Sequence, residues 1–265
     1  MSVSWSVEGC HPEGALATEG SAFAFPTTHN GLRTTNNVPS LLTAASTILA
    51  KELRTEFRTR ELLTTTVVFS LMVVVLFSFT FDPTAAESRR IGGGLLWIAF
   101  LFAGSLMLHP SFTREQSNET LAALRLAPIE PFAILLGKLL ANFLFLLLAE
   151  LLLLPVFAVL YDVPLLPLTT RLLPLLLVLV LGTLGLVTAG TVFAAISAHA
   201  RMRELLLPVL LLIVLTPVLI SAALATTSLL ADPPELPRTA VVLLVAFDVI
   251  FLTATWLFGE YLFEE

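Results

Sequence analysis

Six long apolar stretches alternate with short polar ones along most of the chain. Each has about the 20 apolar residues that a helix needs to cross roughly 30 Å of hydrocarbon. Leu, Val, Ile and Phe follow one another without the in-out alternation of a membrane β-barrel, so the pattern predicts helices. The six predicted spans are residues 62–81, 91–109, 132–160, 172–198, 205–230 and 240–261.

Proline marks the links between these spans. Pro110 and Pro128 flank the second link, and Pro233 and Pro234 lie in the last. Such residues are typical of turns, and no link has room for a soluble domain. Other prolines lie inside predicted spans, where each removes a backbone hydrogen bond and bends its helix. They are Pro155, Pro174, Pro208 and Pro217.

Composition agrees with a membrane protein and excludes several other classes. The 265 residues are 57% hydrophobic and 13% charged, a balance that needs lipid as solvent. The net charge of -6, with no face rich in Lys or Arg, gives no reason to expect a nucleic-acid partner. The single cysteine excludes an intrachain disulfide and a four-cysteine metal site. Scattered histidines and the lack of a phosphate-binding glycine loop predict no metal site, no ATP site and no catalytic residue in this chain.

The distribution of basic residues predicts the orientation, because cytoplasmic loops retain Lys and Arg. With the N-terminus inside, the cytoplasmic side carries ten of the 14 basic residues, and both termini are predicted to be cytoplasmic. Residues 1–40, rich in Gly, Pro, Ser, Thr and Asn, are predicted to form a mobile cytoplasmic tail. They lack the basic start and apolar run of a signal peptide.

The segment 41–61 has helical periodicity of its own. Leu42, Ala45, Leu49, Leu53 and Phe57 recur at helical spacing, whereas the basic residues at 51, 54 and 58 fall on the other side. This pattern predicts an amphipathic helix in the membrane interface, with its apolar face in lipid and its basic groups among headgroups. The alternative is a simple cytoplasmic extension of the first span.

A second charged segment lies between spans two and three. Residues 113–127 start with Thr113 and Gln116, which could form a capping box, and Pro128 follows them. The interpretation is a short amphipathic helix that presents its charged residues to a cytoplasmic partner. A solvated loop helix without a partner is equally compatible with the residues alone. The candidate contact residues are Arg114, Glu115, Glu119 and Arg125.

Two acidic residues lie deep inside predicted spans, Glu150 in the third and Asp248 near the middle of the sixth. An ionisable group in hydrocarbon is costly, so each is expected to face protein or water. Glu150 would be the relay of a proton-coupled carrier, and either residue could equally be a protonated, hydrogen-bonded structural group. The structural role is favoured for Asp248. No Lys or Arg lies mid-span, and no inverted repeat is visible.

Three segments carry a resemblance to a known family: residues 51–61, residues 112–128 followed by Lys138, and the proline-punctuated run 203–220. With six spans, an interfacial helix and no ATPase motif, the chain resembles the permease subunit of an ABC transporter of the ABC-2 (type V exporter) kind. Within that group it is similar to CcmB, the haem exporter B subunit of cytochrome c maturation. The resemblance covers residue 41 to the C-terminus.

The resemblance implies an all-α permease of the inner (plasma) membrane that is not itself an enzyme. Its partners would be a CcmA-like ATPase that binds ATP, CcmC-like and CcmD-like membrane subunits and the CcmE-like haem chaperone. A homodimer, or a pair with a related chain, is also expected. Residues 113–127 would be the coupling helix that docks the ATPase. Haem would be cargo of the complex and not a cofactor of this chain, since the tryptophan-rich loop of the partner subunit is absent.

Other functions fit the same residues. The nearest is an ABC-2 permease that exports a lipid, a polysaccharide or a drug. A secondary carrier would depend on Glu150 and a proton gradient, and a membrane scaffold would transport nothing.

Overall fold

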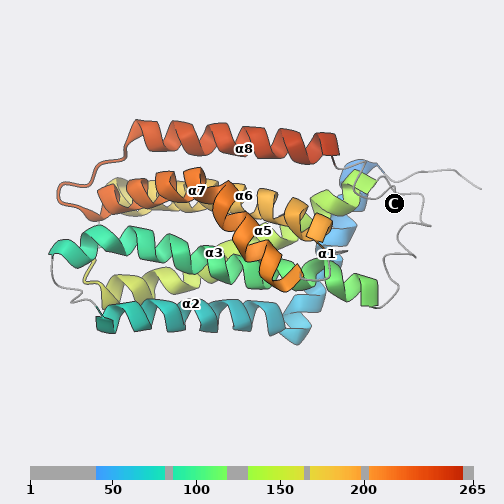
Figure 1. Ribbon diagram of the computed structural model, residues 1–265, viewed down its shortest axis with the longest axis horizontal. Coiled ribbons are helices and arrows are strands. Elements are labelled where there is room, and N and C mark those ends of the chain that lie inside the picture. The colour runs from blue at the N-terminus through green and yellow to red at the C-terminus, as the bar shows by residue number, and fades with distance from the viewer. Residues whose placement is uncertain (1–39, 81–85, 118–130, 164–167, 198–202, 259–265) are drawn as a thin grey trace, which may run out of the picture. The chain divides into compact units, whose positions relative to one another are not determined.

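The computed structural model describes residues 40–80, 86–117, 131–163, 168–197 and 203–258. Residues 1–39 of the predicted tail 1–40, the links 81–85, 118–130, 164–167 and 198–202, and residues 259–265 lie outside the described residues. The helices are α1 (Leu41–Thr59), α2 (Glu61–Thr80), α3 (Ala86–Ser117), α5 (Pro131–Leu160), α6 (Leu173–Ser197), α7 (Arg203–Leu230) and α8 (Arg238–Phe258), with a π-helical turn at Leu168–Leu172 before α6. Helices α2, α3 and α8 run along the long axis, and α1 lies at one end (Figure 1).

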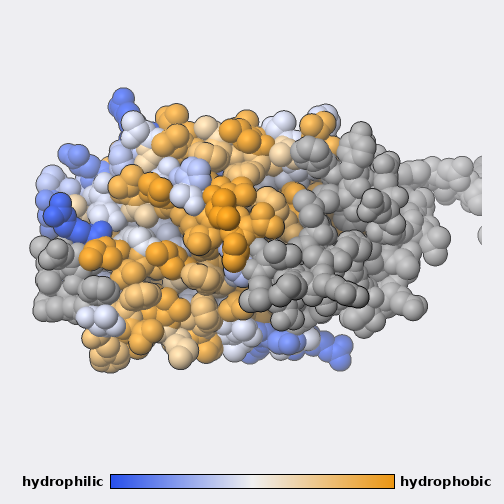
Figure 2. Space-filling view, in the orientation of Figure 1, coloured by the Kyte–Doolittle hydropathy of each residue, from blue (hydrophilic) through white to orange (hydrophobic). Residues whose placement is uncertain are grey.

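The prediction of six membrane helices is confirmed. In the described part of the chain, six helices are long and apolar enough to cross a membrane: Glu61–Thr80, Arg90–Leu108, Phe132–Leu160, Thr170–Ala194, Pro208–Leu230 and Arg238–Leu257. No strand occurs in the described ranges. Orange apolar side chains cover the middle of the face drawn in Figure 2, and blue hydrophilic ones lie toward the ends. The chain is therefore an all-α, multi-pass membrane protein.

Helix α3 forms the centre of the bundle. It packs against α7, α2 and α6, and its span is the most buried of the six, whereas α2 and α8 are the least buried and lie at opposite edges (Figure 1). Lipid tails are as apolar as leucine, so helices in a membrane associate through close packing of small residues and through polar contacts. The interior contains many such residues, among them Ala99, Ala103, Ala189, Ala222, Ala225, Thr188 and Thr191.

The candidate membrane span Arg90–Leu108 agrees with the predicted span 91–109, but the expected capping box at Thr113 and Gln116 is wrong. Helix α3 continues through Pro110 and Thr113 to Ser117. Proline cannot donate the hydrogen bond of its turn, but membrane helices tolerate that loss where neighbouring helices support the bend. The first five residues of the expected coupling helix, 113–117, therefore belong to α3 beyond its candidate span, and the remainder, 118–127, lies outside the described residues.

Helix α1 is separate from α2. It begins after Ser40, whose hydroxyl accepts a hydrogen bond from the Thr43 amide at 3.4 Å. It ends at Thr59, because Arg60 adopts a left-handed conformation with φ 55° and its amide bonds the Glu56 carbonyl at 2.6 Å. Leu42 and Phe57 of the expected apolar face are exposed. Ala45 of the same expected face, together with Ile48, packs on α5. The interfacial position of α1 stays a prediction.

Candidate functional site

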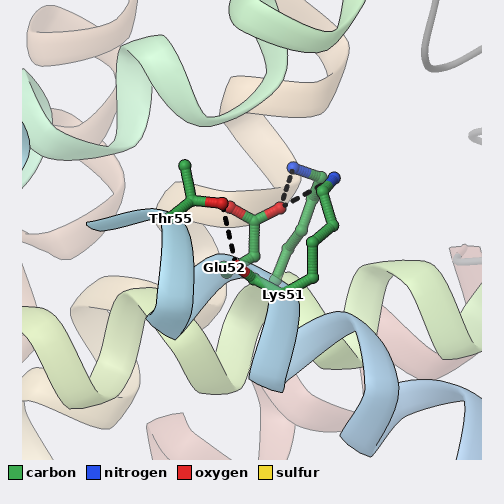
Figure 3. Close-up of polar contacts among 4 residues, drawn as sticks. Lys51, Glu52 and Thr55 are labelled. Atoms are coloured by element: carbon green, nitrogen blue, oxygen red, sulfur yellow. Dashed lines mark hydrogen bonds and ion pairs between the residues drawn. The ribbon is translucent and has the colours of Figure 1, made fainter. Parts of the chain in front are cut away.

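The docking of α1 on α5 brings together charges from segments 86 residues apart. Gly137 of α5 permits the contact: a Cβ there would lie 2.8 Å from the Ile48 Cβ and 2.9 Å from the Ala45 carbonyl oxygen. The next residue, Lys138, is buried with 1% of its side chain exposed, and its Nζ lies 3.6 Å from Glu52 Oε1. The Nζ of Lys51 lies 3.4 Å from the same oxygen (Figure 3). One carboxylate thus compensates a buried ammonium group.

A second glutamate of α1 fixes the turn into the first span. Glu56 is buried, and its Oε1 accepts a hydrogen bond from the Leu63 amide at 2.8 Å. The amides of a helix's first turn have no partner within the helix and carry partial positive charge, so an acidic side chain stabilises that end. Glu56 therefore caps α2 from the preceding helix. Together the two glutamates hold α1, α2 and α5 in one arrangement.

Helix α6 organises the polar residues in the middle of the bundle. Glu150 of α5 is fully buried, and Thr183 donates a hydrogen bond to its Oε2 at 2.5 Å. The other oxygen, Oε1, has no hydrogen-bond partner among the described residues. Of the two surroundings expected for Glu150, protein or water, the structure places it against protein, and Thr183 is its hydrogen-bond partner.

Asp248 of α8 is also buried, with 4% of the residue exposed. A Cβ on Gly185 of α6 would lie 2.9 Å from its Oδ1 and 3.4 Å from a methyl carbon of Val218 of α7. Within the described ranges, neither carboxyl oxygen has a hydrogen-bond partner. The residue faces the junction of α6, α7 and α8 and not the lipid, as predicted from the cost of exposing it there. The favoured hydrogen-bonded role gains no partner from the described residues.

Trp97 joins three helices. Its indole is 1% exposed and lies directly against Gly182 of α6, and its Nε1 donates to Thr226 Oγ1 of α7 at 2.9 Å.

Arg171, in the π-helical turn before α6, forms an ion pair with Asp232 of the α7–α8 link. It also donates to the Ala231 carbonyl at 3.4 Å. Sequence reasoning identified neither contact.

The predicted ATPase contacts divide between described and undescribed parts. Arg114 and Glu115 lie in the last turns of α3. Glu119 and Arg125 lie outside the described residues. Sequence reasoning also missed the Glu52–Lys138 pair, although a lysine seven residues into an apolar span was a signal for it. Among the described residues, no group of three His, Cys, Asp or Glu side chains is placed to hold a metal ion.

Comparison with known proteins identifies the family. The family profile described as CcmB protein matches residues 43–258. The chain belongs to the CcmB family. The match begins within α1 and ends with α8, so it includes both the α1–α5 junction and all six spans.

Curated relatives of this CcmB-family chain carry one name, heme exporter protein B. The protein of that name from Pseudomonas aeruginosa is 34% identical over 213 residues, which cover 79% of this chain and 92% of the relative. The one from Rhodobacter capsulatus is 34% identical over 176 residues, 66% of this chain and 79% of the relative. The one from Bradyrhizobium diazoefficiens is 27% identical over 192 residues, 72% and 85%.

Proposed function

We propose that the chain is the permease subunit of a CcmABCD-like ABC complex that handles haem during cytochrome c maturation. The observation that carries the proposal is the family match across α1 to α8, together with relatives named as heme exporters. The chain would supply membrane helices and no catalytic group, and ATP would bind a CcmA-like partner. CcmC-like and CcmD-like subunits and a CcmE-like chaperone would complete the pathway, with haem as cargo.

The complex would reside in the inner membrane, with both ends of this chain in the cytoplasm. The excess of basic residues on that side supports this orientation. It would place α1 in the cytoplasmic interface, beside the proposed ATPase. The tail, 1–39, would then also be cytoplasmic.

Coupling to ATP would pass through residues 113–127. An ATPase can bias the permease only by binding one arrangement of its helices more tightly than another. Helix α3 is continuous from Ala86 to Ser117, which supports this route, because displacement of its outer turns would move its buried part directly. That part holds Trp97, whose contacts reach α6 and α7. In this proposal α3 is the element that transmits movement, and its charged end docks the ATPase.

Haem staining of c-type cytochromes in cells that lack this gene tests the proposal. Loss of covalent haem, with recovery when the gene is reintroduced, is the expected result. A matched control reintroduces only the partner ATPase gene and is expected to restore nothing. Normal staining without the gene would contradict the proposal and favour an ABC-2 permease for another cargo.

A further inference from the structure

A groove of about 410 Å³ opens on the outer side of the bundle where α1, α2 and α5 meet. Its walls are apolar, from Leu63 and Val67 of α2 and Phe145 and Leu152 of α5. One end is formed by Glu56 and Arg60. The groove therefore has apolar walls and one basic residue, Arg60.

The turn between α1 and α2 determines the charge at that end. Glu56 is buried and occupied with the Leu63 amide. Arg60 is exposed, and no hydrogen bond or ion pair of its guanidinium occurs among the described residues. Because the Glu56 carboxylate bonds to the Leu63 amide and Arg60 is exposed, Arg60 is the charged group of the lining that is accessible to an anionic headgroup.

The position of Arg60 corresponds to the headgroup level of a bilayer. The first span, Glu61–Thr80, begins one residue after it. Helix α2 is the least buried of the spans, so the walls of the groove that it forms face lipid. Val68 and Leu152, which also line the groove, are exposed by 57% and 49%. An occupant from the membrane would thus meet apolar walls below and a guanidinium at the surface.

We propose that this groove binds an anionic phospholipid, with an acyl chain along α2 and α5 and the phosphate on Arg60. Guanidinium groups bind phosphate oxygens through paired, charge-assisted hydrogen bonds. Haem would also present an apolar body and anionic groups, but the lining contains no His, Cys, Met or Tyr to ligate its iron. Phospholipid is therefore the occupant that the chemistry favours. The site is independent of the cargo proposed above.

Native mass spectrometry of the purified full chain in detergent tests the site. Dioleoylphosphatidylglycerol is titrated against zwitterionic dioleoylphosphatidylethanolamine, and retained adducts are counted. Arg60→Asn removes the charge with a residue that tolerates the left-handed backbone at φ 55°. We expect it to weaken phosphatidylglycerol binding about five-fold, as for one basic group at a membrane surface. Arg60→Lys is expected to keep most of the binding.

Two further variants separate the groove from general surface charge. Arg58→Asn removes an exposed basic residue that does not line the groove and is expected to leave binding unchanged. Val68→Trp fills the groove from a position exposed to lipid and is expected to displace the bound lipid without disturbing the core. Folding of each variant is checked by its thermal unfolding temperature.

Several outcomes would overturn the proposal. Equal retention of both lipids would contradict a preference for anionic phospholipid. Equal loss with Arg58→Asn and Arg60→Asn would show that Arg60 forms no specific phosphate site. Displacement of phosphatidylglycerol by haemin in an Arg60-dependent manner would assign the groove to haem instead. A dimer that Val68→Trp dissociates would assign it to a second copy of this chain.

Discussion

Replacement of Gly182 by alanine tests whether the contact between α3 and α6 determines the packing of the bundle. The new Cβ would lie 2.0 Å from Trp97 Cη2, 2.6 Å from Cζ3 and 2.8 Å from Cζ2. The indole has no free space, since it is 1% exposed and its Nε1 is bound to Thr226. Either α6 must move away from α3, or the indole must leave its hydrogen bond.

The cost follows from these two alternatives. Overpacking of a filled interior costs about 1–3 kcal/mol. Loss of an interhelical hydrogen bond in a membrane adds about 0.6 kcal/mol on average. We therefore expect Gly182→Ala to destabilise the protein by about 2–3 kcal/mol. For a chain of this size that corresponds to a fall of roughly 5–10 °C in the unfolding temperature.

Thermal unfolding in detergent, followed by fluorescence-detected size exclusion, measures the effect. Gly94→Ala is the matched control, because a Cβ at Gly94 would meet nothing within 4 Å. Trp97→Phe shortens the ring, so Gly182→Ala should cost much less in that background. The reasoning is refuted if Gly182→Ala unfolds at the same temperature as Gly94→Ala, or if Trp97→Phe gives no relief.

Three other predictions concern the charged residues. In the same unfolding assay, Glu52→Gln removes the negative charge beside Lys138 and should cost about 2–3 kcal/mol, less than for a fully buried pair because Glu52 is 24% exposed. The double change with Lys138→Met should cost much less. Glu150→Gln keeps an acceptor for Thr183 and should leave haem staining unchanged, while loss of staining would support a proton relay. Charge reversal at both Arg114 and Glu119 should uncouple ATP hydrolysis from maturation with membrane insertion intact, and normal maturation would contradict the coupling role.

The six spans were predictable because their signal is composition over about 20 residues, which lipid imposes on any spanning helix. The continuation of α3 beyond its span was not, because the expected link rested on one proline. Pro110 breaks a helix in water, where the freed carbonyl group can bond to solvent, but here α3 continues to Ser117.

The polar residues of the interior show a different limit. The depth of Glu150 and Asp248 in their spans predicted burial correctly, since depth follows from sequence position. The residues that contact them could not be predicted, because Thr183 and Gly185 belong to another helix, whose rotation about its axis the sequence pattern leaves undefined. Apolar residues are distributed so evenly around α6 that no apolar face can be distinguished. The Lys138–Glu52 pair could not be predicted for the same reason, because its two residues lie 86 positions apart in the sequence.

Within four residues of α6, contacts arrive from three helices. Trp97 of α3 lies on Gly182, Glu150 of α5 accepts from Thr183, and Asp248 of α8 lies against Gly185. Sliding α5 past α6 would break the hydrogen bond between Thr183 and Glu150, which water cannot replace in hydrocarbon. If the proposed coupling through α3 is correct, movement of α3 is expected to carry this centre as one body.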